Sequence, residues 1–406
     1  MNKNADTIST EDAHFAPFFN RAPVSIERGQ GIYVWDESGK RYLDFTAGWG
    51  VTSIGHASPV ISQALAEQSK KIIHNPDSGL TYSPARARLL SLLKQVLPEG
   101  LTRVFFTNSG TEAVDAAIKL ARKASGKTNV ISAHGSFHGR TIGAVSATGQ
   151  DAYRHRYKPL LPNHVTIAFN DVDALSAVIA NDVAAFIVEP IQGEGGVRVP
   201  SVDYLERVSG LCIRHQVYLI VDEVQTGFFR TGPAFMSSNP SIKVDFLTMA
   251  KGIAGGFPFG AFAFTEGIAG KLEKGDHGGT YCGNPLGCSV ASAVIGYMLD
   301  NDIGSNAEQV SSHILAKLNE WRSEYPEAIA DVRGKGLLIG MELKDASAAK
   351  RIKQECFERG LLINVTQGNV IRIFPALNIT LDEAGEGLTI LKDAMDNVCG
   401  LTEKRQ

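Results

Sequence analysis

Seven short apolar runs between residues 104 and 265 constrain the fold of this chain more than any other feature. Each run indicates a buried strand of about five residues, and segments with helical spacing separate the runs. Such an alternation is typical of a large, mostly parallel sheet covered by helices. The runs are VFFTN, NVISA, VTIAF, AAFIVEP, VYLIVDE, DFLTMAK and GAFAFTE.

The segment 110–123 shows the helical pattern clearly. Its apolar positions follow the i, i+3, i+4, i+7 spacing of one helix face. They are Ala113, Ala116, Ala117 and Leu120. Ser109 or Asn108 is placed to cap the start of this helix. The sequence therefore predicts a helix directly after the VFFTN strand.

The length of 406 residues exceeds what one hydrophobic core usually carries. We expect a large domain over residues 58–305 and a small domain formed by residues 1–57 and 306–406. In the first segment, GIYVWDESGKRYLDF alternates like a β-hairpin with a turn at residues 37–40. After residue 305, amphipathic helical patterns and the strand-like KGLLIGMEL and NVIRIF predict an α+β unit.

Composition and charge exclude several classes of protein. With 44% hydrophobic and 20% charged residues, the chain is similar to ordinary globular enzymes or binding proteins. The net charge of −3 gives no sign of a nucleic-acid or membrane partner. The sequence contains no apolar signal region and no run of about 18 apolar residues. Five cysteines without a C-x-x-C pair suit isolated thiols, so we expect a cytoplasmic protein.

Polar residues directly after apolar runs mark the expected site, because ligands of open parallel sheets collect at the carboxyl ends of strands. Glu189 follows AAFIV, Asp222 follows VYLIV and the NSGT turn follows VFFT. Singly, each has a structural interpretation as a loop acid, a helix cap or a turn. Lys251 stands among apolar residues and glycines in TMAKGIAGGFPFG, where an unpaired buried ammonium would be costly. Together these residues indicate a shared ligand.

A lysine, an aspartate and a glycine-containing helix start suit one cofactor, pyridoxal phosphate. Lys251 would form a Schiff base with the cofactor aldehyde, which removes the need to bury a free ammonium. Asp222 would face the pyridine nitrogen and keep it protonated, so that the ring can accept electrons from a substrate carbanion. The backbone N–H groups of Gly110 and Thr111 would hold the phosphate at the helix N-terminus.

These residues also carry a family resemblance. The chain resembles the class III (ω-amino acid) aminotransferases, which are fold type I pyridoxal phosphate enzymes, from VWDESGKRYLDF to NVIRIFPALNIT. The motifs, in chain order, are NSGTEA, FHGRT, EPIQGEGG, IVDEVQTG, MAKGIAGGFP and GGTYCGNPL. The resemblance implies an α/β fold with a large domain, built on a mostly parallel seven-stranded sheet, and a smaller α+β domain.

The resemblance assigns further residues to the cofactor. Phe137 would stack on the ring, since an aromatic face lies flat on a conjugated system, and Gln225 would lie near the ring hydroxyl. Thr280 in GGTY resembles the threonine that reaches the phosphate of the neighbouring subunit, which implies a homodimer with shared active sites; an ordinary turn hydroxyl is the alternative. The predicted cofactor-binding set is Ser109, Gly110, Thr111, Phe137, His138, Glu189, Asp222, Val224, Gln225, Lys251 and Thr280.

Two arginines and an acid are expected to recognise the substrates. Arg140 in FHGRT and Arg372 in NVIRIF resemble the pair that binds substrate carboxylates in this family through bidentate hydrogen bonds. Glu194 in GEGG resembles the acid that pairs with the second arginine while an ω-amine donor is bound and releases it for a dicarboxylate. The alternatives are a structural salt bridge for Arg372 and a surface loop for Glu194. Trp49 and Gly279 complete the predicted substrate-binding set.

The C-terminal phrases RGKGLLIGMEL and GLLINVTQGNVIR are similar to those of acetylornithine and succinylornithine aminotransferases. Three features depart from that subgroup. Gly279 stands where acetylornithine enzymes usually carry a second Ser or Thr, and GGTY is closer to the motif of 4-aminobutyrate aminotransferases. Trp49 stands where isoleucine is usual, and TGFFRTG with Phe228 and Phe229 is bulkier than its usual equivalent. Large aromatics beside the pocket could narrow it or stack on a different donor.

We therefore predict a pyridoxal phosphate-dependent aminotransferase that moves an ω-amino group from acetylornithine or a related ornithine derivative to 2-oxoglutarate, giving the semialdehyde and glutamate. Its partners would be the amino donor, the 2-oxo acid acceptor and a second copy of the chain. The alternatives are a 4-aminobutyrate or diamine aminotransferase, an amino-acid racemase on the same scaffold, and a non-catalytic module with this fold. Glutamate formation from 2-oxoglutarate separates transfer from racemisation.

Two histidines four residues apart, His134 and His138, raise the alternative of a metal site. They follow a strand rather than lie on a helix, and no cysteine or carboxylate completes a set. His138 is expected to neighbour the cofactor instead. Cys282 and Cys288 do not have the usual zinc spacing. We predict no metal.

Overall fold

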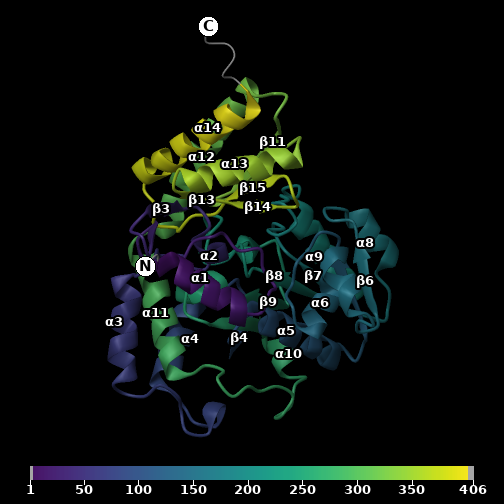
Figure 1. Ribbon diagram of the computed structural model, residues 1–406. Coiled ribbons are helices and arrows are strands. Elements are labelled where there is room, and N and C mark those ends of the chain that lie inside the picture. Colours follow the sequence, from purple (N-terminus) through teal and green to yellow (C-terminus); the bar gives the residue numbers. More distant parts are fainter. Residues whose placement is uncertain (1–2, 401–406) are drawn as a thin grey trace.

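The computed structural model describes residues 3–400 and centres on a seven-stranded sheet in the order β4-β10-β9-β8-β7-β5-β6 (Figure 1). The neighbours from β9 to β6 are all parallel, whereas β10 runs antiparallel to β4 and β9. The strands are β4 (Leu101–Thr107), β5 (Asn129–Ala133), β6 (His164–Ile167), β7 (Val183–Val188), β8 (Tyr218–Asp222), β9 (Phe246–Met249) and β10 (Gly260–Thr265). The predicted mostly parallel sheet of seven strands is confirmed.

The three central strands β7, β8 and β9 determine where the site lies. They are parallel neighbours, so their carboxyl ends meet at one edge of the sheet. Their side chains are fully buried from Val183 to Val188 and from Phe246 to Met249, because helices cover both faces. The polar residues that follow these strands are therefore brought together at one rim.

Helix α5 (Gly110–Ser125) packs across the sheet through a face of small residues. Ala113, Ala117 and Leu120 on this face are buried, as the apolar spacing predicts. Ser109 is the N-cap, and its hydroxyl accepts a hydrogen bond from the Glu112 N–H at 3.4 Å. The predicted helix is confirmed, and its N-terminus points at the carboxyl edge of the sheet.

Further helices surround this sheet. The α-helices are α3 (Pro59–Ser69), α4 (Pro84–Val96), α6 (Ile142–Ala147), α7 (Asp151–Arg154), α8 (Val172–Val178), α9 (Tyr204–His215), α10 (Glu266–Ala269) and α11 (Pro285–Asp300). Short 3-10 turns are η1 (Ser78–Leu80), η2 (His155–Tyr157), η3 (Met236–Ser238) and η4 (Lys251–Ala254). Within residues 3–400, no helix has both the length and the apolar character that crossing a membrane would require.

The N-terminal segment contains the predicted hairpin. Strands β2 (Tyr33–Asp36) and β3 (Arg41–Asp44) pair antiparallel around the turn at 37–40, where the Asp36 carboxylate accepts the N–H groups of Ser38 and Lys40, each at 2.9 Å. β1 (Ile26–Gln30) pairs with β2, and β3 pairs in parallel with β13 (Leu361–Leu362). The remaining elements of this segment are α1 (Lys3–His14) and α2 (Ala47–Gly50). Both ends of the chain thus contribute to one sheet.

The C-terminal segment forms a four-stranded, fully antiparallel sheet in the order β11-β12-β15-β14. Figure 1 shows it at the top of the view with three helices, above the large sheet. These elements are α12 (Ile303–Glu324), β11 (Ile329–Lys335), β12 (Leu338–Leu343), α13 (Ala346–Glu358), β14 (Asn364–Thr366), β15 (Val370–Ile373) and α14 (Leu381–Cys399). The two-domain division stays a prediction. Its boundary after residue 305 falls in the first turn of α12, and residues 1–2 and 401–406 lie outside the described residues.

Candidate active site

A cavity of about 1380 Å³ lies at the rim where the central strands end. Glu189 follows β7, Asp222 ends β8 and Lys251 comes two residues after β9, and all three line the cavity with the N-terminus of α5. Most of the predicted site residues share this cavity. They are Trp49, Ser109, Gly110, Thr111, Phe137, His138, Arg140, Glu189, Glu194, Asp222, Val224, Gln225 and Lys251.

Lys251 begins the 3-10 turn η4 with a left-handed backbone, at φ 45°, which is unusual for a residue with a side chain. Its amine has no hydrogen-bond partner among the residues that the structure describes. Burial lowers the pKa of Lys251 to about 8; the Arg372 cation acts in the same direction, while the Glu194 carboxylate opposes both. An amine with this pKa is neutral far more often than an ordinary lysine, as a nucleophile or base must be.

Asp222 is held from three sides. His138 Nδ1 lies 2.7 Å from its Oδ2, and the Thr248 hydroxyl donates to its Oδ1 at 2.9 Å. The Val224 N–H donates to the same oxygen at 3.2 Å. Asp222 and His138 are buried. The carboxylate therefore has one fixed orientation toward the cavity.

Glu189 supports the cavity wall rather than facing a cation. Its carboxylate accepts the N–H of Phe137 at 2.9 Å and that of Gly193 at 3.3 Å. Burial raises the pKa of Glu189 to about 7, the Asp222 charge adds to the rise, and His138 with the two N–H bonds limits it. The Phe137 ring meets the Tyr153 ring edge-on at 5.2 Å. The backbone N–H and the side-chain ring of Phe137 are thus both held in place.

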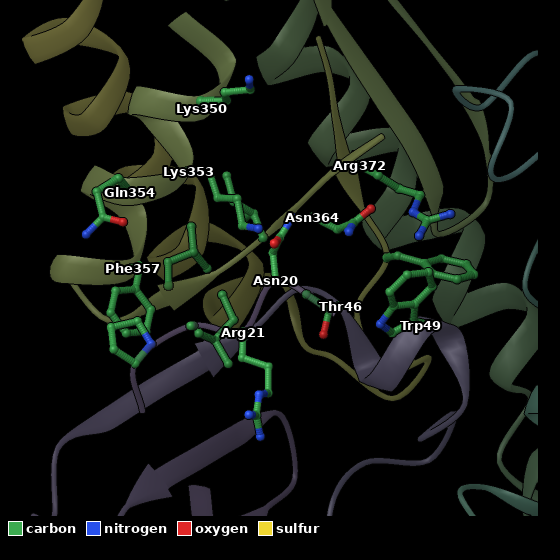
Figure 2. Close-up of a pocket in the computed structure, with 16 residues that line it drawn as sticks. Asn20, Arg21, Thr46, Trp49, Lys350, Lys353, Gln354, Phe357, Asn364 and Arg372 are labelled. Atoms are coloured by element: carbon green, nitrogen blue, oxygen red, sulfur yellow. The ribbon is translucent and has the colours of Figure 1, made fainter. Parts of the chain in front are cut away.

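Arg372 and Glu194 form a buried ion pair beside the cavity. Arg372 Nη1 donates to Glu194 Oε1 at 2.7 Å, and Gln225 bonds to both partners at 3.3–3.4 Å. Burial alone would raise the pKa of Glu194, but the charges of Arg372 and Lys251 outweigh it and the pKa is lowered. Glu194 is therefore ionised and neutralises Arg372. The Trp49 ring lies 5.9 Å from the guanidinium (Figure 2).

Arg140 lies at the exposed side of the same cavity. Its guanidinium is 4.9 Å from the ring centre of Tyr153 and 5.7 Å from that of Phe137. The hydroxyl of Thr111 accepts the N–H groups of Arg140 and Thr141 at 3.0 and 3.1 Å. These bonds join the start of α5 to the loop that carries Arg140.

The start of α5 can hold a phosphate. Within the described chain, the N–H groups of Gly110 and Thr111 have no hydrogen-bond partner, as expected for the first turn of a helix. A Cβ on Gly110 would lie 3.0 Å from both methyl groups of Val224, so a side chain there would have to displace Val224. A phosphate-binding helix start, a buried amine of lowered pKa, a fixed carboxylate and an aromatic ring fit pyridoxal phosphate.

Three predicted residues do not line this cavity, and one of them, Arg372, lines a smaller cavity beside it. Thr280 is exposed, and Gly279 lines a separate cavity of about 400 Å³ beside α5. The Ser78 hydroxyl donates to the carbonyls of both residues. The role assigned to Thr280 concerns a neighbouring subunit and stays a prediction.

Sequence reasoning missed two residues that shape the site. Thr248 pairs with Asp222 in the β8–β9 register, and Tyr153 packs on Phe137 and lines the cavity. A hydroxyl inside the apolar run DFLTMAK was the available signal for Thr248, whereas nothing in the sequence around Tyr153 marks it. Among residues 3–400, no group of three His, Cys, Asp or Glu side chains is arranged to hold a metal ion. His138 instead contacts Asp222.

Comparison with known proteins identifies the family. The pattern of the family described as aminotransferase class-III matches residues 16–395. The chain belongs to the class-III aminotransferase family. It is 40% identical over 386 residues to the acetylornithine aminotransferase of Methanothermobacter thermautotrophicus, covering 95% of this chain and 97% of that one. It is 41% identical over 384 residues to that of Methanopyrus kandleri, with 95% and 97% covered.

Solved structures show the same fold. The ornithine aminotransferase of Toxoplasma gondii ME49 superposes with a TM-score of 0.92 at 31% identity, covering 98% of this chain and 96% of that one. The acetylornithine aminotransferase of Elizabethkingia anophelis has a TM-score of 0.85 at 32% identity, with 97% and 99% covered. The predicted family, fold and enzyme class, a pyridoxal phosphate-dependent aminotransferase, are confirmed.

Proposed function

We propose that this aminotransferase moves the ω-amino group of acetylornithine, or of a related ornithine derivative, to 2-oxoglutarate. The observation that carries the proposal is the buried Glu194–Arg372 pair at 2.7 Å beside Lys251's cavity. One pocket must accept an uncharged chain from the donor and a second carboxylate from the acceptor. An acid that neutralises the carboxylate-binding arginine for the first substrate and releases it for the second suits such an enzyme.

Lys251 and Asp222 would perform the chemistry common to both half-reactions. Bound pyridoxal phosphate supplies a conjugated, cationic ring that withdraws electrons from the substrate carbon. Lys251 Nζ would hold the cofactor and then move the proton between substrate and cofactor carbons, a task that its lowered pKa favours. Asp222, oriented by His138 and Thr248, would stabilise the positive charge at the ring nitrogen.

Glu194 and Arg372 would distinguish the substrates. The donor presents an uncharged chain near its ω-amine, so Arg372 is best left paired with Glu194. The acceptor presents a second carboxylate, which Arg372 can bind only when Glu194 releases it. Gln225 bonds to both partners and can stay with either one.

The identity of the donor rests on the relatives and on Arg140. The relatives named above are acetylornithine and ornithine aminotransferases, and Arg140 offers a cation at the open side for the carboxylate at the far end of such a donor. Trp49 favours a second candidate, a shorter donor such as 4-aminobutyrate, because its ring lies 5.9 Å from the Arg372 guanidinium and lines the same cavity as Lys251.

We further infer that the chain forms a homodimer. Exposed apolar side chains gather around Thr280, an arrangement that usually marks an interaction surface. The segments 72–82 and 279–286 adjoin, since Ser78 bonds to the Gly279 carbonyl at 3.2 Å. The exposed residues are Ile72, Ile73, Leu80, Tyr82 and Tyr281. The cytoplasm remains the proposed location, and the five unpaired cysteines support it.

Single-donor mixing tests the proposal. The enzyme with its cofactor is mixed separately with acetylornithine, succinylornithine, ornithine, 4-aminobutyrate and putrescine, and the absorbance of the bound cofactor is followed. We expect acetylornithine to react fastest. Glutamate is then measured after 2-oxoglutarate is added. A fastest reaction with 4-aminobutyrate would select the second candidate, and no glutamate from any donor would refute transfer to 2-oxoglutarate.

A further inference from the structure

A side cavity of about 480 Å³ lies beside the main one, between the N-terminal segment and α13 (Figure 2). The two cavities are adjacent and share four lining residues. The shared residues are Asn20, Trp49, Lys353 and Asn364. Arg372 also lines the side cavity, so a molecule there would lie next to the Glu194–Arg372 pair.

The lining of this side cavity is cationic. Arg21, Lys350, Lys353 and Arg372 contribute to it, and within the described part of the chain no carboxylate does. Arg21 is paired with Glu11 and Asp12, and Arg372 is paired with Glu194. Lys350 and Lys353 have no ion pair among residues 3–400. The side cavity is therefore locally positive, although the chain as a whole has a net charge of −3.

Asn364 connects the lysines to Arg372. In the β14–β15 register Asn364 stands directly opposite Arg372, so the two side chains lie on the same face of the sheet. Its Oδ1 is buried without a hydrogen-bond partner within the described residues. In the view of Figure 2, Asn364 lies between Lys353 and Arg372. A carboxylate that bridges the two cations would accept a hydrogen bond from Asn364 Nδ2, because Oδ1 is itself an acceptor.

We propose that this side cavity is a carboxylate-binding subsite, in which Lys353 and Asn364 hold the dicarboxylate acceptor next to Arg372 before Arg372 is released from Glu194. The proposal rests on the proposed function, because it assumes an acceptor with two carboxylates. Its physical reason is that Arg372 is neutralised in the structure and cannot attract the acceptor by itself. A nearby unpaired ammonium supplies that attraction and raises the local concentration of dianions.

Lys353→Gln tests the subsite, and Lys350→Gln is the matched control. Both lysines are exposed on α13 three residues apart, so each change removes one charge at little risk to folding. Lys350 lines only the side cavity, whereas Lys353 also lines the main one. If the lysines act only through their general electric field, both variants should lose affinity for the dicarboxylate equally. If a local subsite exists, Lys353→Gln should lose more affinity than Lys350→Gln.

Two measurements on the enzyme with its cofactor follow. Calorimetry measures the affinity for glutarate, a dicarboxylate without the oxo group, which cannot react. Steady-state kinetics compares 2-oxoglutarate with 2-oxopentanoate, which has one carboxylate. We expect Lys353→Gln to weaken glutarate binding and to raise KM for 2-oxoglutarate about three- to tenfold, with kcat and the 2-oxopentanoate reaction unchanged. Added salt should reduce the difference.

Four outcomes decide the proposal. A larger effect of Lys353→Gln than of Lys350→Gln supports the subsite. Wild-type values for Lys353→Gln, or equal effects of both variants, overturn it even if transfer to 2-oxoglutarate is normal. If the wild-type enzyme does not use 2-oxoglutarate but still binds glutarate through Lys353, the dicarboxylate subsite stands and the proposed function fails.

Discussion

Thr248 donates its hydroxyl hydrogen to Asp222 Oδ1 at 2.9 Å across the parallel pair β8–β9. With His138 on the other carboxylate oxygen, this bond leaves Asp222 no freedom to turn away from the cavity. The orientation is thus determined by strand register and by a loop 84 residues earlier in the chain. The carboxylate and its supports can be tested separately.

Asp222→Asn should retain the fold and lose activity by about 10³-fold, because a neutral amide cannot stabilise a cationic ring nitrogen. Thr248→Val should cost less, roughly tenfold, since it removes one orienting bond and leaves the charge. The measurement is single-turnover rate with the chosen donor, with thermal unfolding as the control for folding. Near-normal turnover of Asp222→Asn would show that the Asp222 charge is not needed to stabilise the ring nitrogen.

The Glu194–Arg372 pair should behave as a switch. Arg372→Ala should slow the 2-oxoglutarate half-reaction far more than the donor half-reaction, because losing a desolvated bidentate carboxylate contact costs about 2–5 kcal/mol. Glu194→Gln should do the reverse, since the uncovered arginine would favour dicarboxylates. Each half-reaction is followed separately through the cofactor absorbance. Equal losses in both half-reactions for both variants would show that the pair is structural.

How much of this site the sequence predicts depends on whether a signal is local. Lys251, Asp222 and the start of α5 stand directly after apolar runs, so the rule for parallel sheets predicts from the sequence that they lie together. The bond from Gln225 to Glu194 and the packing of Tyr153 on Phe137 join segments that only the order of the strands makes neighbours. The antiparallel direction of β10 is likewise not encoded in its apolar run.

The C-terminal segment shows the same limit. The apolar run around Arg372 predicts its strand, but the register that places Asn364 opposite Arg372 depends on how β14 and β15 pair. A shift of one residue would move Asn364 to the other face of the sheet. The side cavity and its excess of lysines therefore become visible only in three dimensions.

The apolar surface around Thr280 should be the dimer interface. Leu80→Asp combined with Tyr82→Asp places charge on side chains that are 88% and 102% exposed, so the monomer should fold while association fails. Sedimentation velocity should then show monomers, and activity should fall because Thr280 no longer reaches a partner. Val202→Asp, at an equally exposed apolar residue before α9, is the matched control and should stay dimeric. Dimers of the double variant would place the interface elsewhere.

Lys251 gives the last prediction through its lowered pKa. Burial, with help from Arg372, lowers the pKa of Lys251 to about 8, and Glu194 limits the fall. Only the neutral amine attacks an aldehyde, so at pH 7 about a tenth of the Lys251 side chains can react, against fewer than about one in a thousand for an ordinary lysine. Attachment of the cofactor to the apo-protein therefore reports this pKa.

The rate of that attachment should rise about tenfold from pH 6 to pH 7 and level off above the pKa of about 8. Glu194→Gln removes a charge that holds the proton on Lys251, so the plateau should begin at lower pH. Arg372→Ala removes a charge that repels the proton, so the plateau should begin at higher pH. Stopped-flow absorbance measures the rate, and borohydride reduction followed by peptide mapping should place the label on Lys251. A rate that still climbs tenfold between pH 9 and pH 10, or a label on another lysine, would contradict the assignment. If the plateau begins at lower pH in Glu194→Gln and at higher pH in Arg372→Ala, the ion pair contributes to the pKa of Lys251.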